Sequence, residues 1–339
     1  MELGILTLGD LQRDPRTGRQ HRAVDRTAEA LGYAELADQL GLDVFAVGEH
    51  HSPEFTTSSP AVLLAAAAAR TSRIRLTSAV TLLGVLDPVR VYEDFATLDL
   101  ISRGRAEITA GRSAFVEPFA LFGHDTADYD QLFAEKLDLL LQVRDNERVT
   151  WSGRYRPALS DAPVIPRAVQ EPLPIWVGVG GTVSSAERAG RLGLPMTLGY
   201  IGGTLQHLRP LVDAYRAAGA RAGHPKRLQL GLSTHLYVGA NPAAARAVYP
   251  FFHEYLRPKT PGGRGFTVTP AAFEAATSPH GATMVGSAEE LTTKLLDAKR
   301  TLGLDRVYGQ IDWGGLPQRM VEESIARFAQ NVAPTLREG

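Results

Sequence analysis

Apolar residues follow two alternating patterns along the whole chain. Short runs rich in Val, Ile and Leu predict buried strands, and the longer stretches between them, with apolar residues three or four positions apart, predict amphipathic helices. The strand-like runs are residues 3–8, 44–47, 74–81, 106–110, 175–179, 195–198, 228–238 and 306–311. Strands and helices in alternation favour a parallel sheet. Eight such units predict an α/β fold, the closed (β/α)8 TIM barrel, with an open doubly wound sheet as the alternative.

Two stretches interrupt this alternation. Residues 150–174 hold five prolines and predict an ordered loop excursion after the fourth helix. Residues 257–281 are rich in glycine and proline with little periodicity, and predict a second excursion after the seventh strand. A long loop inside one domain commonly serves as a lid or a mobile segment. Because no repeat or linker divides the chain, residues 1–339 are expected to form one domain.

The composition narrows the classes of function. With 44% hydrophobic residues, 22% charged residues and a formal net charge of -1, the chain is typical of a globular protein without the basic face that binds nucleic acids or anionic membranes. The absence of cysteine excludes disulfides, thiolate metal sites and cysteine nucleophiles. Neither a secretory signal nor a run long enough to span a bilayer is visible, so a cytoplasmic enzyme is expected.

A glycine- and hydroxyl-rich turn follows the fifth strand, at the end of the barrel where active sites of this fold lie. Gly180 and Gly181 permit a tight turn, and Thr182, Ser184 and Ser185 offer hydroxyls where a helix begins near Ser184. The first turn of a helix attracts an anion. The alternative is an ordinary helix start with Ser184 as its N-cap. Since the third glycine of a dinucleotide motif is missing, the turn suits one phosphate better than a pyrophosphate.

Arg112 directly follows the fourth strand. A guanidinium at this position could clamp a phosphate through two parallel hydrogen bonds, although a solvated arginine would fit the sequence as well. Arg112 and the turn after the fifth strand together favour a phosphate site.

Two adjacent histidines, His50 and His51, follow the second strand in the sequence Gly-Glu-His-His. Neighbouring residues of an extended segment point in opposite directions and rarely ligate one ion, so no metal site is expected. A histidine here could be buried and hydrogen-bonded in the core, or it could face the cavity and exchange a proton near neutral pH. Schiff-base chemistry is disfavoured because no lysine stands at the carboxyl end of a predicted strand.

Several motifs in one order resemble the bacterial luciferase-like flavin-dependent monooxygenases, and the resemblance runs through nearly the whole chain. It is densest in residues 41–51, 58–60, 69–76, 87–90, 97–105 and 193–196. The resemblance implies an FMN-dependent monooxygenase whose reduced FMN comes from a separate NAD(P)H-dependent reductase. With O2 it would form a C4a-(hydro)peroxyflavin that acts on a small organic substrate.

The resemblance also gives roles to single residues. It places the FMN phosphate at Arg112, Gly181, Thr182 and Ser185, with the backbone of Ala114 nearby. The third predicted strand carries Ser78, Ala79 and Val80, and the resemblance implies a cis peptide between Ala79 and Val80 beneath the isoalloxazine. Tyr200 matches an aromatic residue beside the flavin, and His50 matches a histidine that serves as general acid or base, or as a hydrogen-bond partner.

The sequence departs from the family pattern at two places, and several alternative functions stay open. Gly111 stands where luciferases carry a reactive thiol, and residues 257–281 do not match the luciferase lid, so light emission is not implied. A deazaflavin (F420)-dependent dehydrogenase on the same barrel, a non-catalytic flavin-binding protein and a phosphate-binding isomerase are the alternatives. The Glu-His-His motif and the compact phosphate turn favour FMN. An aldehyde, a ketone, a sulfonate or a natural-product intermediate would fit as substrate.

The Ala- and Leu-rich helix predicted at 60–70 is apolar on most of its surface. It could pack on the barrel, or it could form the homodimer interface that the resemblance implies for the early helices.

Overall fold

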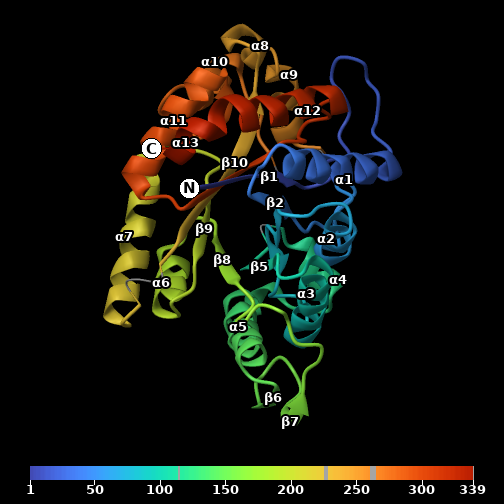
Figure 1. Ribbon diagram of the computed structural model, residues 1–339, viewed down its shortest axis with the longest axis vertical. Coiled ribbons are helices and arrows are strands. Elements are labelled where there is room, and N and C mark those ends of the chain that lie inside the picture. Colours follow the sequence, from blue (N-terminus) through green and yellow to red (C-terminus); the bar gives the residue numbers. More distant parts are fainter. Residues whose placement is uncertain (114, 225–227, 260–264, 339) are drawn as a thin grey trace.

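The computed structural model describes residues 1–113, 115–224, 228–259 and 265–338 (Figure 1). Eight parallel strands form a closed ring in the order β1, β2, β3, β5, β8, β9, β10 and β12, and the pairing of β12 with β1 completes it. This ring confirms the predicted TIM barrel. The strands of the ring are β1 (Glu2–Thr7), β2 (Val44–Val47), β3 (Arg75–Ser78), β5 (Ala106–Gly111), β8 (Ile175–Val179), β9 (Met196–Gly199), β10 (Leu230–Val238) and β12 (Arg306–Gln310).

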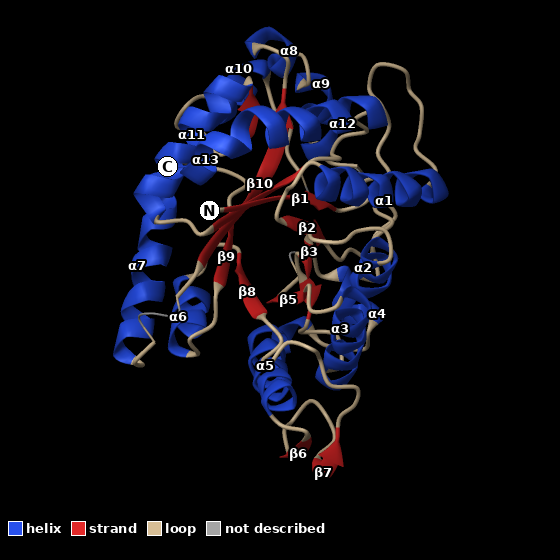
Figure 2. Cartoon of the chain, viewed as in Figure 1, coloured by secondary structure: helices blue, strands red, loops and turns tan. Residues whose placement is uncertain are grey.

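Helices surround the barrel on its outer side (Figure 2). Their bounds are α1 (Ala23–Gln39), α2 (Pro60–Ala68), α3 (Pro88–Ser102), α4 (Glu117–Leu121), α5 (Tyr129–Asp145), α6 (Val183–Arg191), α7 (Leu205–Arg221), α8 (Pro242–Arg246), α9 (Tyr249–Leu256), α10 (Pro270–Thr277), α11 (Ala288–Leu302), α12 (Gln318–Arg327) and α13 (Ala333–Glu338). Several helices begin where the sequence provides a cap. Asp87 accepts a hydrogen bond from the backbone of Val89 at the start of α3, and Ser287 and Glu290 form a capping box at the start of α11.

The predicted strands lie within two residues of the observed ones, except for the third. There the run 74–81 divides into β3 and the two-residue strand β4 (Thr81–Leu82), which pairs with β5. The peptide bond between Ala79 and Val80 is cis, as expected.

The two interrupting stretches contain more regular structure than the sequence predicted. The excursion 150–174 belongs to an antiparallel hairpin of β6 (Arg148–Trp151) and β7 (Leu159–Pro163). The second excursion contains α10, so the prediction of an irregular loop is wrong for residues 270–277. Pro270 at its first position and the Thr269 hydroxyl, which accepts from the backbone of Ala272 at 3.2 Å, start this short helix without the long periodic pattern that predicts one. A further strand, β11 (Met284–Gly286), pairs with β10.

Charged side chains connect four strands near their amino ends, opposite the expected site. The buried guanidinium of Arg306 in β12 donates to Glu107 of β5 at 2.5 Å and contacts Glu2 of β1 at 2.6 Å. It also lies 4.3 Å from the ring centre of Trp176, and Glu107 accepts a further bond from Arg75 of β3. Removing one partner of a buried pair leaves an uncompensated charge, which costs roughly 3–5 kcal/mol. These contacts therefore stabilise the closed ring.

Within the described residues, no helix combines the length and the apolar character that crossing a membrane requires.

Candidate active site

Three residues predicted to meet a phosphate lie together at the carboxyl ends of β5 and β8. One Arg112 nitrogen, Nη2, donates to the hydroxyl of Thr182 at 3.1 Å and to that of Ser185 at 2.6 Å, and the two hydroxyls are 2.7 Å apart. The other nitrogen, Nη1, pairs with the exposed carboxylate of Asp130. The ring of Tyr129 lies 5.0 Å from the guanidinium. We call Arg112, Thr182 and Ser185 the anion cradle.

The start of α6 differs by one position from the sequence expectation. Thr182 has extended backbone angles and is the N-cap, so the helix begins at Val183 and the interpretation of Ser184 as the cap is wrong. The side chain of Ser184 is exposed beside the cradle. Thr182 makes no side-chain cap bond within the helix; its hydroxyl instead donates to Ser185.

The two glycines before α6 leave the cradle accessible. Gly181 has a φ of +143°, which favours glycine, and a Cβ added at Gly180 or Gly181 would have no described atom within 4 Å. A ligand can therefore approach the backbone closely at this turn. Ala114, expected nearby, lies outside the described residues.

Arg188, one turn further along α6, is a residue that the sequence did not single out. Its Nη1 is buried and has no hydrogen-bond partner in the described parts of the chain. Burial, and after it the positive charge of Arg112, lowers the pKa of Arg188. A buried donor without a partner is costly, and a charged acceptor is its best partner. The charge of Arg188 acts on that of Arg112, so an anion such as a phosphate at the cradle would offset both positive charges.

The cis segment is packed tightly against glycines of the neighbouring strands. A Cβ added at Gly111 would lie 2.4 Å from a methyl of Val80, and one at Gly178 would lie 2.6 Å from the other methyl. A Cβ at Gly48 would lie 3.1 Å from the carbonyl of Ala79. The side chain of Val80 thus occupies the space that a side chain at position 111 would need. Position 111 is the one at which the family resemblance implies a thiol in luciferases.

Ser78 is placed differently from its neighbours. Its hydroxyl is buried and accepts from the backbone of Thr109 at 3.0 Å and from the hydroxyl of Thr81 at 2.9 Å. The side chain therefore connects β3, β4 and β5, and only the backbone of this position remains as a candidate for cofactor contact.

The two histidines after β2 differ in their surroundings. The ring of His50 stacks on Phe55 with centres 4.2 Å apart and meets the edge of Phe115 at 5.2 Å. Burial, with a smaller effect of His51, lowers the pKa of His50 to about 4. His50 is therefore neutral at neutral pH, which narrows the expected acid or base role to that of a base or hydrogen-bond partner.

His51 instead fixes the loop. Its Nε2 lies 2.8 Å from a carboxylate oxygen of Glu49, whose other oxygen accepts from the backbone of Leu82 at 3.0 Å. Glu49 is buried, so the pair ties the end of β2 to β4.

Tyr200, expected beside the flavin, follows β9 and is 1% exposed. Its hydroxyl donates to the carbonyl of Gly203 at 3.5 Å, and burial raises its pKa to about 12. The contacts described do not join it to the cradle.

His235 in β10 is a second residue that the sequence did not single out. A Cβ at Gly231 would contact Thr197 and Trp176, and the alternation of a strand puts His235 on the same, inner face. Its Nδ1 is buried with no hydrogen-bond partner among the described residues, and burial lowers its pKa to about 4. The ring meets the edges of three aromatic residues with centres 5.3–6.4 Å away: Phe252, Tyr255 and Trp313. The sequence offered one signal for this residue: His235 is a polar residue at an inward-facing position of the predicted strand 228–238.

A buried acidic pair connects the carboxyl ends of β1 and β12. Thr7 donates to Asp312 at 2.5 Å, and Asp10 accepts from the backbone of Gly315 at 3.1 Å. Burial raises the pKa of Asp10 to about 7, and burial also raises the pKa of Asp312 above its ordinary value. The buried Arg26 donates to the carbonyl of Asp10 at 2.9 Å, so this charge cluster fixes the two loops at the barrel mouth.

Two cavities lie on either side of Leu256, which lines both. The first, of about 390 Å3, lies between the loop after β9 and α10. The second, of about 420 Å3, lies beside His51 and Phe55 and has charged residues in its wall: Glu54, Glu117, Arg257 and Lys259.

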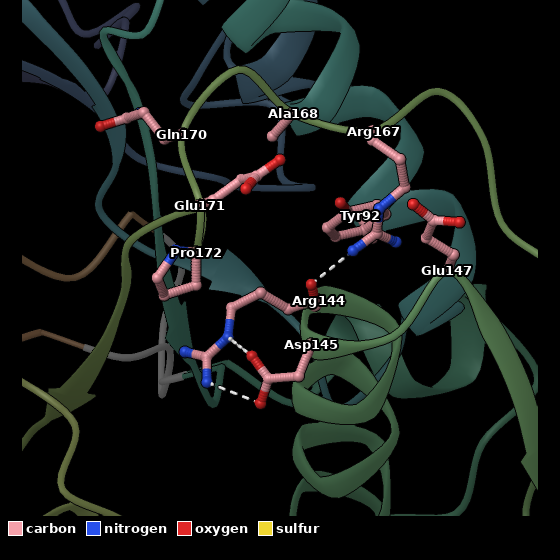
Figure 3. A pocket seen from close by; sticks show the side chains of 9 residues that line it. All are labelled: Tyr92, Arg144, Asp145, Glu147, Arg167, Ala168, Gln170, Glu171 and Pro172. Carbon is pink, nitrogen blue, oxygen red and sulfur yellow. Dashed lines mark hydrogen bonds and ion pairs between the residues drawn. The ribbon is translucent and has the colours of Figure 1, made fainter.

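A third cavity, shown in Figure 3, lies away from this end of the barrel. Its walls come from α3, the end of α5 and the segment before β8. Its arginines already have partners, because Arg144 pairs with Asp145 at 2.7 Å and Arg167 donates to the carbonyl of Arg144 at 2.5 Å. This cavity is therefore no candidate for the active site.

The fold is that of a TIM-barrel protein with a candidate anion site at the carboxyl ends of its strands, where active sites of this fold lie. The model of the luciferase-like monooxygenase family matches residues 1–306, and the chain belongs to this family, as its motifs indicated. The uncharacterised protein y4wF of Sinorhizobium fredii is 29% identical over 303 residues, which cover 86% of each chain. An F420-dependent glucose-6-phosphate dehydrogenase of Amycolatopsis mediterranei is 30% identical over 178 residues, which cover 49% of this chain and 51% of that enzyme.

A solved structure with the same fold is a type II Baeyer-Villiger monooxygenase from Pseudomonas putida, the oxygenating constituent of 3,6-diketocamphane monooxygenase, in complex with FMN. It superposes with a TM-score of 0.80 at 18% identity and covers 98% of both chains. The family thus contains both monooxygenases and F420-dependent dehydrogenases, and this chain is related to oxidoreductases.

Proposed function

We propose that this protein is a monooxygenase that uses reduced FMN and O2 to oxidise a small organic substrate. The observation that carries the proposal is the anion cradle, together with the buried Nη1 of Arg188 that lacks a partner. A single compact cluster of one guanidinium and two hydroxyls suits the single phosphate of FMN.

Different residues would bind different parts of FMN. Arg112, Thr182 and Ser185 would hold the phosphate, with Gly180 and Gly181 leaving room for it and Ser184 at its edge. The segment of Ser78, Ala79 and Val80 would lie beneath the ring system, and Tyr200 would stand beside it. When bound, reduced FMN supplies two electrons to O2, one atom of which enters the substrate while the other leaves as water.

His50 is the residue proposed to act in the reaction. Its neutral imidazole, placed between Phe55 and Phe115, can accept a proton or a hydrogen bond from the reacting group. The two rings cover part of the imidazole, and a bound substrate would cover more of it, which limits the wasteful release of hydrogen peroxide.

Replacing His50 tests this role. His50→Ala should lower coupled turnover about 10²–10⁴-fold, the range of a general acid or base, while FMN still binds. The measurement is product formed per O2 consumed with photoreduced FMN and a panel of ketones, aldehydes and sulfonates. His51→Ala is the control, because His51 contacts Glu49 and should affect stability more than coupling. Full coupled turnover in His50→Ala would refute the assignment.

An F420-dependent dehydrogenase is the second candidate, favoured by the relative from Amycolatopsis mediterranei. Titration of the purified protein with FMN and with F420 separates the two. Tight binding of F420 without measurable binding of FMN would replace the first proposal by the second.

Two partners belong to the proposal. A separate NAD(P)H-dependent reductase would supply the reduced FMN, and a second copy of the chain would pack on α2. In that helix Leu64 and Ala67 are buried against the barrel, whereas Val62 on the outer side is 69% exposed. Sedimentation showing only a monomer at micromolar concentration would remove the dimer.

A further inference from the structure

The cavity between the loop after β9 and α10 is lined mainly by apolar and small residues, with Thr204, Ser278, His280 and Thr283 as its polar members. Ile201 and Phe266, which are 71% and 60% exposed, reach it from two different segments, and Phe252 and Leu256 of α9 and Val268 also line it. None of the described residues that line it is Asp, Glu, Lys or Arg. We call it the apolar cavity.

The small side chains of helix α10 leave the space that forms the apolar cavity. The residues that α10 contributes to the wall are Ala272, Ala275 and Ala276, spaced three and four positions apart so that they share one face. Small side chains on a helix that borders a cavity leave space that larger ones would fill. The volume of about 390 Å3 lies in the range of small-molecule sites.

The apolar cavity lies next to Tyr200 and His235, at the end of the barrel where the flavin is proposed to bind. Its first wall residue, Ile201, directly follows Tyr200, and the Thr234 hydroxyl of β10 donates at 2.8 Å to the carbonyl of Ala282 in another wall. The ring of Phe252 in the wall meets the edge of the inward-facing His235 at 5.5 Å. The cavity therefore lies beside the mouth of the barrel, at the ends of β9 and β10.

We propose that the apolar cavity is the substrate site and that the substrate is an uncharged, largely hydrocarbon molecule. This inference rests on the proposed function, because it names the substrate class for that reaction. Charged groups would lose their hydration here without gaining a counter-ion. The second cavity, with Glu54, Glu117, Arg257 and Lys259 in its wall, differs in just this respect. A pocket of this volume fits a small molecule, whereas a stable protein partner needs a buried area of roughly 1,000 Å2 or more.

The test compares a neutral and a charged probe of the same ring system, 2-acetylnaphthalene and naphthalene-2-sulfonate. Each is titrated into the full chain by calorimetry, without cofactor. The wild-type protein should bind the neutral probe at least tenfold more tightly. Ala275→Leu and Ala272→Leu should weaken that binding at least tenfold because they fill the cavity. Ala271→Leu is the matched control, since Ala271 is exposed on the same helix but does not line the cavity.

FMN binding is measured on every variant to separate this inference from the proposed function. Equal affinity for the two probes, or equal behaviour of Ala275→Leu and Ala271→Leu, would overturn the inference while FMN binding stands. A shift from dimer to monomer in Ala275→Leu would also overturn it, because a second copy would then occupy the cavity. Failure of the wild-type chain to bind FMN, with the probes behaving as expected, would refute the proposed function and leave an apolar ligand site.

Discussion

The anion cradle and the apolar cavity lie near the same end of the barrel, yet they are built in opposite ways. In the cradle, Arg112, Thr182 and Ser185 already hold one another by hydrogen bonds of 2.6–3.1 Å. In the apolar cavity, the wall consists mainly of hydrocarbon and small side chains from separate segments, and none of its described members is Asp, Glu, Lys or Arg. Directional contacts recognise one chemical group closely, whereas apolar walls select by size and polarity. The two proposed sites would thus combine strict recognition of one ligand with permissive recognition of another.

The largest effect is expected on the affinity for FMN when the anion cradle loses its arginine. Arg112→Ala removes the guanidinium that both hydroxyls contact, and truncating one partner of a charged hydrogen-bonded pair costs roughly 2–5 kcal/mol. We expect the affinity for FMN to fall by about 10²-fold, measured by quenching of flavin fluorescence, while 2-acetylnaphthalene binds as before.

Asp130→Asn is the control for this variant. Asp130 pairs with Arg112 from the exposed side and would compete with a phosphate, so its removal should leave the FMN affinity equal or higher. An Arg112→Ala protein that retains FMN affinity within twofold would show that the cradle is not the phosphate site.

An intermediate effect concerns the glycines behind the cis segment. Gly111→Ala places a Cβ 2.4 Å from Val80, and overpacking of this kind costs roughly 1–3 kcal/mol in the free energy of unfolding. Gly180→Ala, where the added Cβ meets open space, should change it by less than about 0.5 kcal/mol. Denaturant unfolding measures both. The double variant Gly111→Ala with Val80→Ala should recover most of the loss; no recovery would mean that Val80 is not the residue displaced.

The smallest effect compares the pH dependence of stability at two histidines: His50 after β2, and His235, whose ring contacts Phe252 in the wall of the apolar cavity. Burial lowers the pKa of both His50 and His235 to about 4, so the unfolded chain, with a histidine pKa near 6.5, binds more protons below that pH. The stability contribution is present above pH 6.5 and is lost as the pH falls towards 4. For His235, which is 3% exposed, the loss between pH 7 and pH 5.5 is about 1 kcal/mol.

His235→Phe should therefore reduce the acid sensitivity of the unfolding free energy over this interval, and His50→Phe should change it in the same direction. Unfolding curves at pH 7 and pH 5.5 give the comparison. An unchanged pH dependence in His235→Phe would mean that the His235 ring is accessible to water.

The sequence predicted that Arg112 would lie beside the turn after the fifth strand, and the structure shows this proximity; the signals for it are local. Glycines and hydroxyls next to a helix start, and an arginine at a strand end, carry their chemistry in residue type and position. The cap at Thr182 in place of Ser184 was missed because neighbouring hydroxyl residues can each take that role, and backbone angles decide between them.

The apolar cavity was not predicted, for a physical reason. Its wall joins residues 201–204, 252–256 and 266–283, and alanine or phenylalanine in such segments resembles ordinary core. Arg188 and His235 were missed likewise, since a buried nitrogen without a partner is a property of the surroundings and not of the residue. The roles of His50 and of the cradle in catalysis stay predictions until the variants above are measured.

The contacts of Arg306 at the other end of the barrel have a consequence for folding. They join Glu2 of the first strand to Arg306 of the last strand, 304 residues further along the chain, so this cluster completes only after the last strand has been synthesised. Contacts between residues so distant in sequence form late, because the entropy of closing the loop is lost first. Until Arg306 arrives, the carboxylates of Glu2 and Glu107 lack this partner, and a nascent barrel would keep its first strand exposed to unwanted pairing.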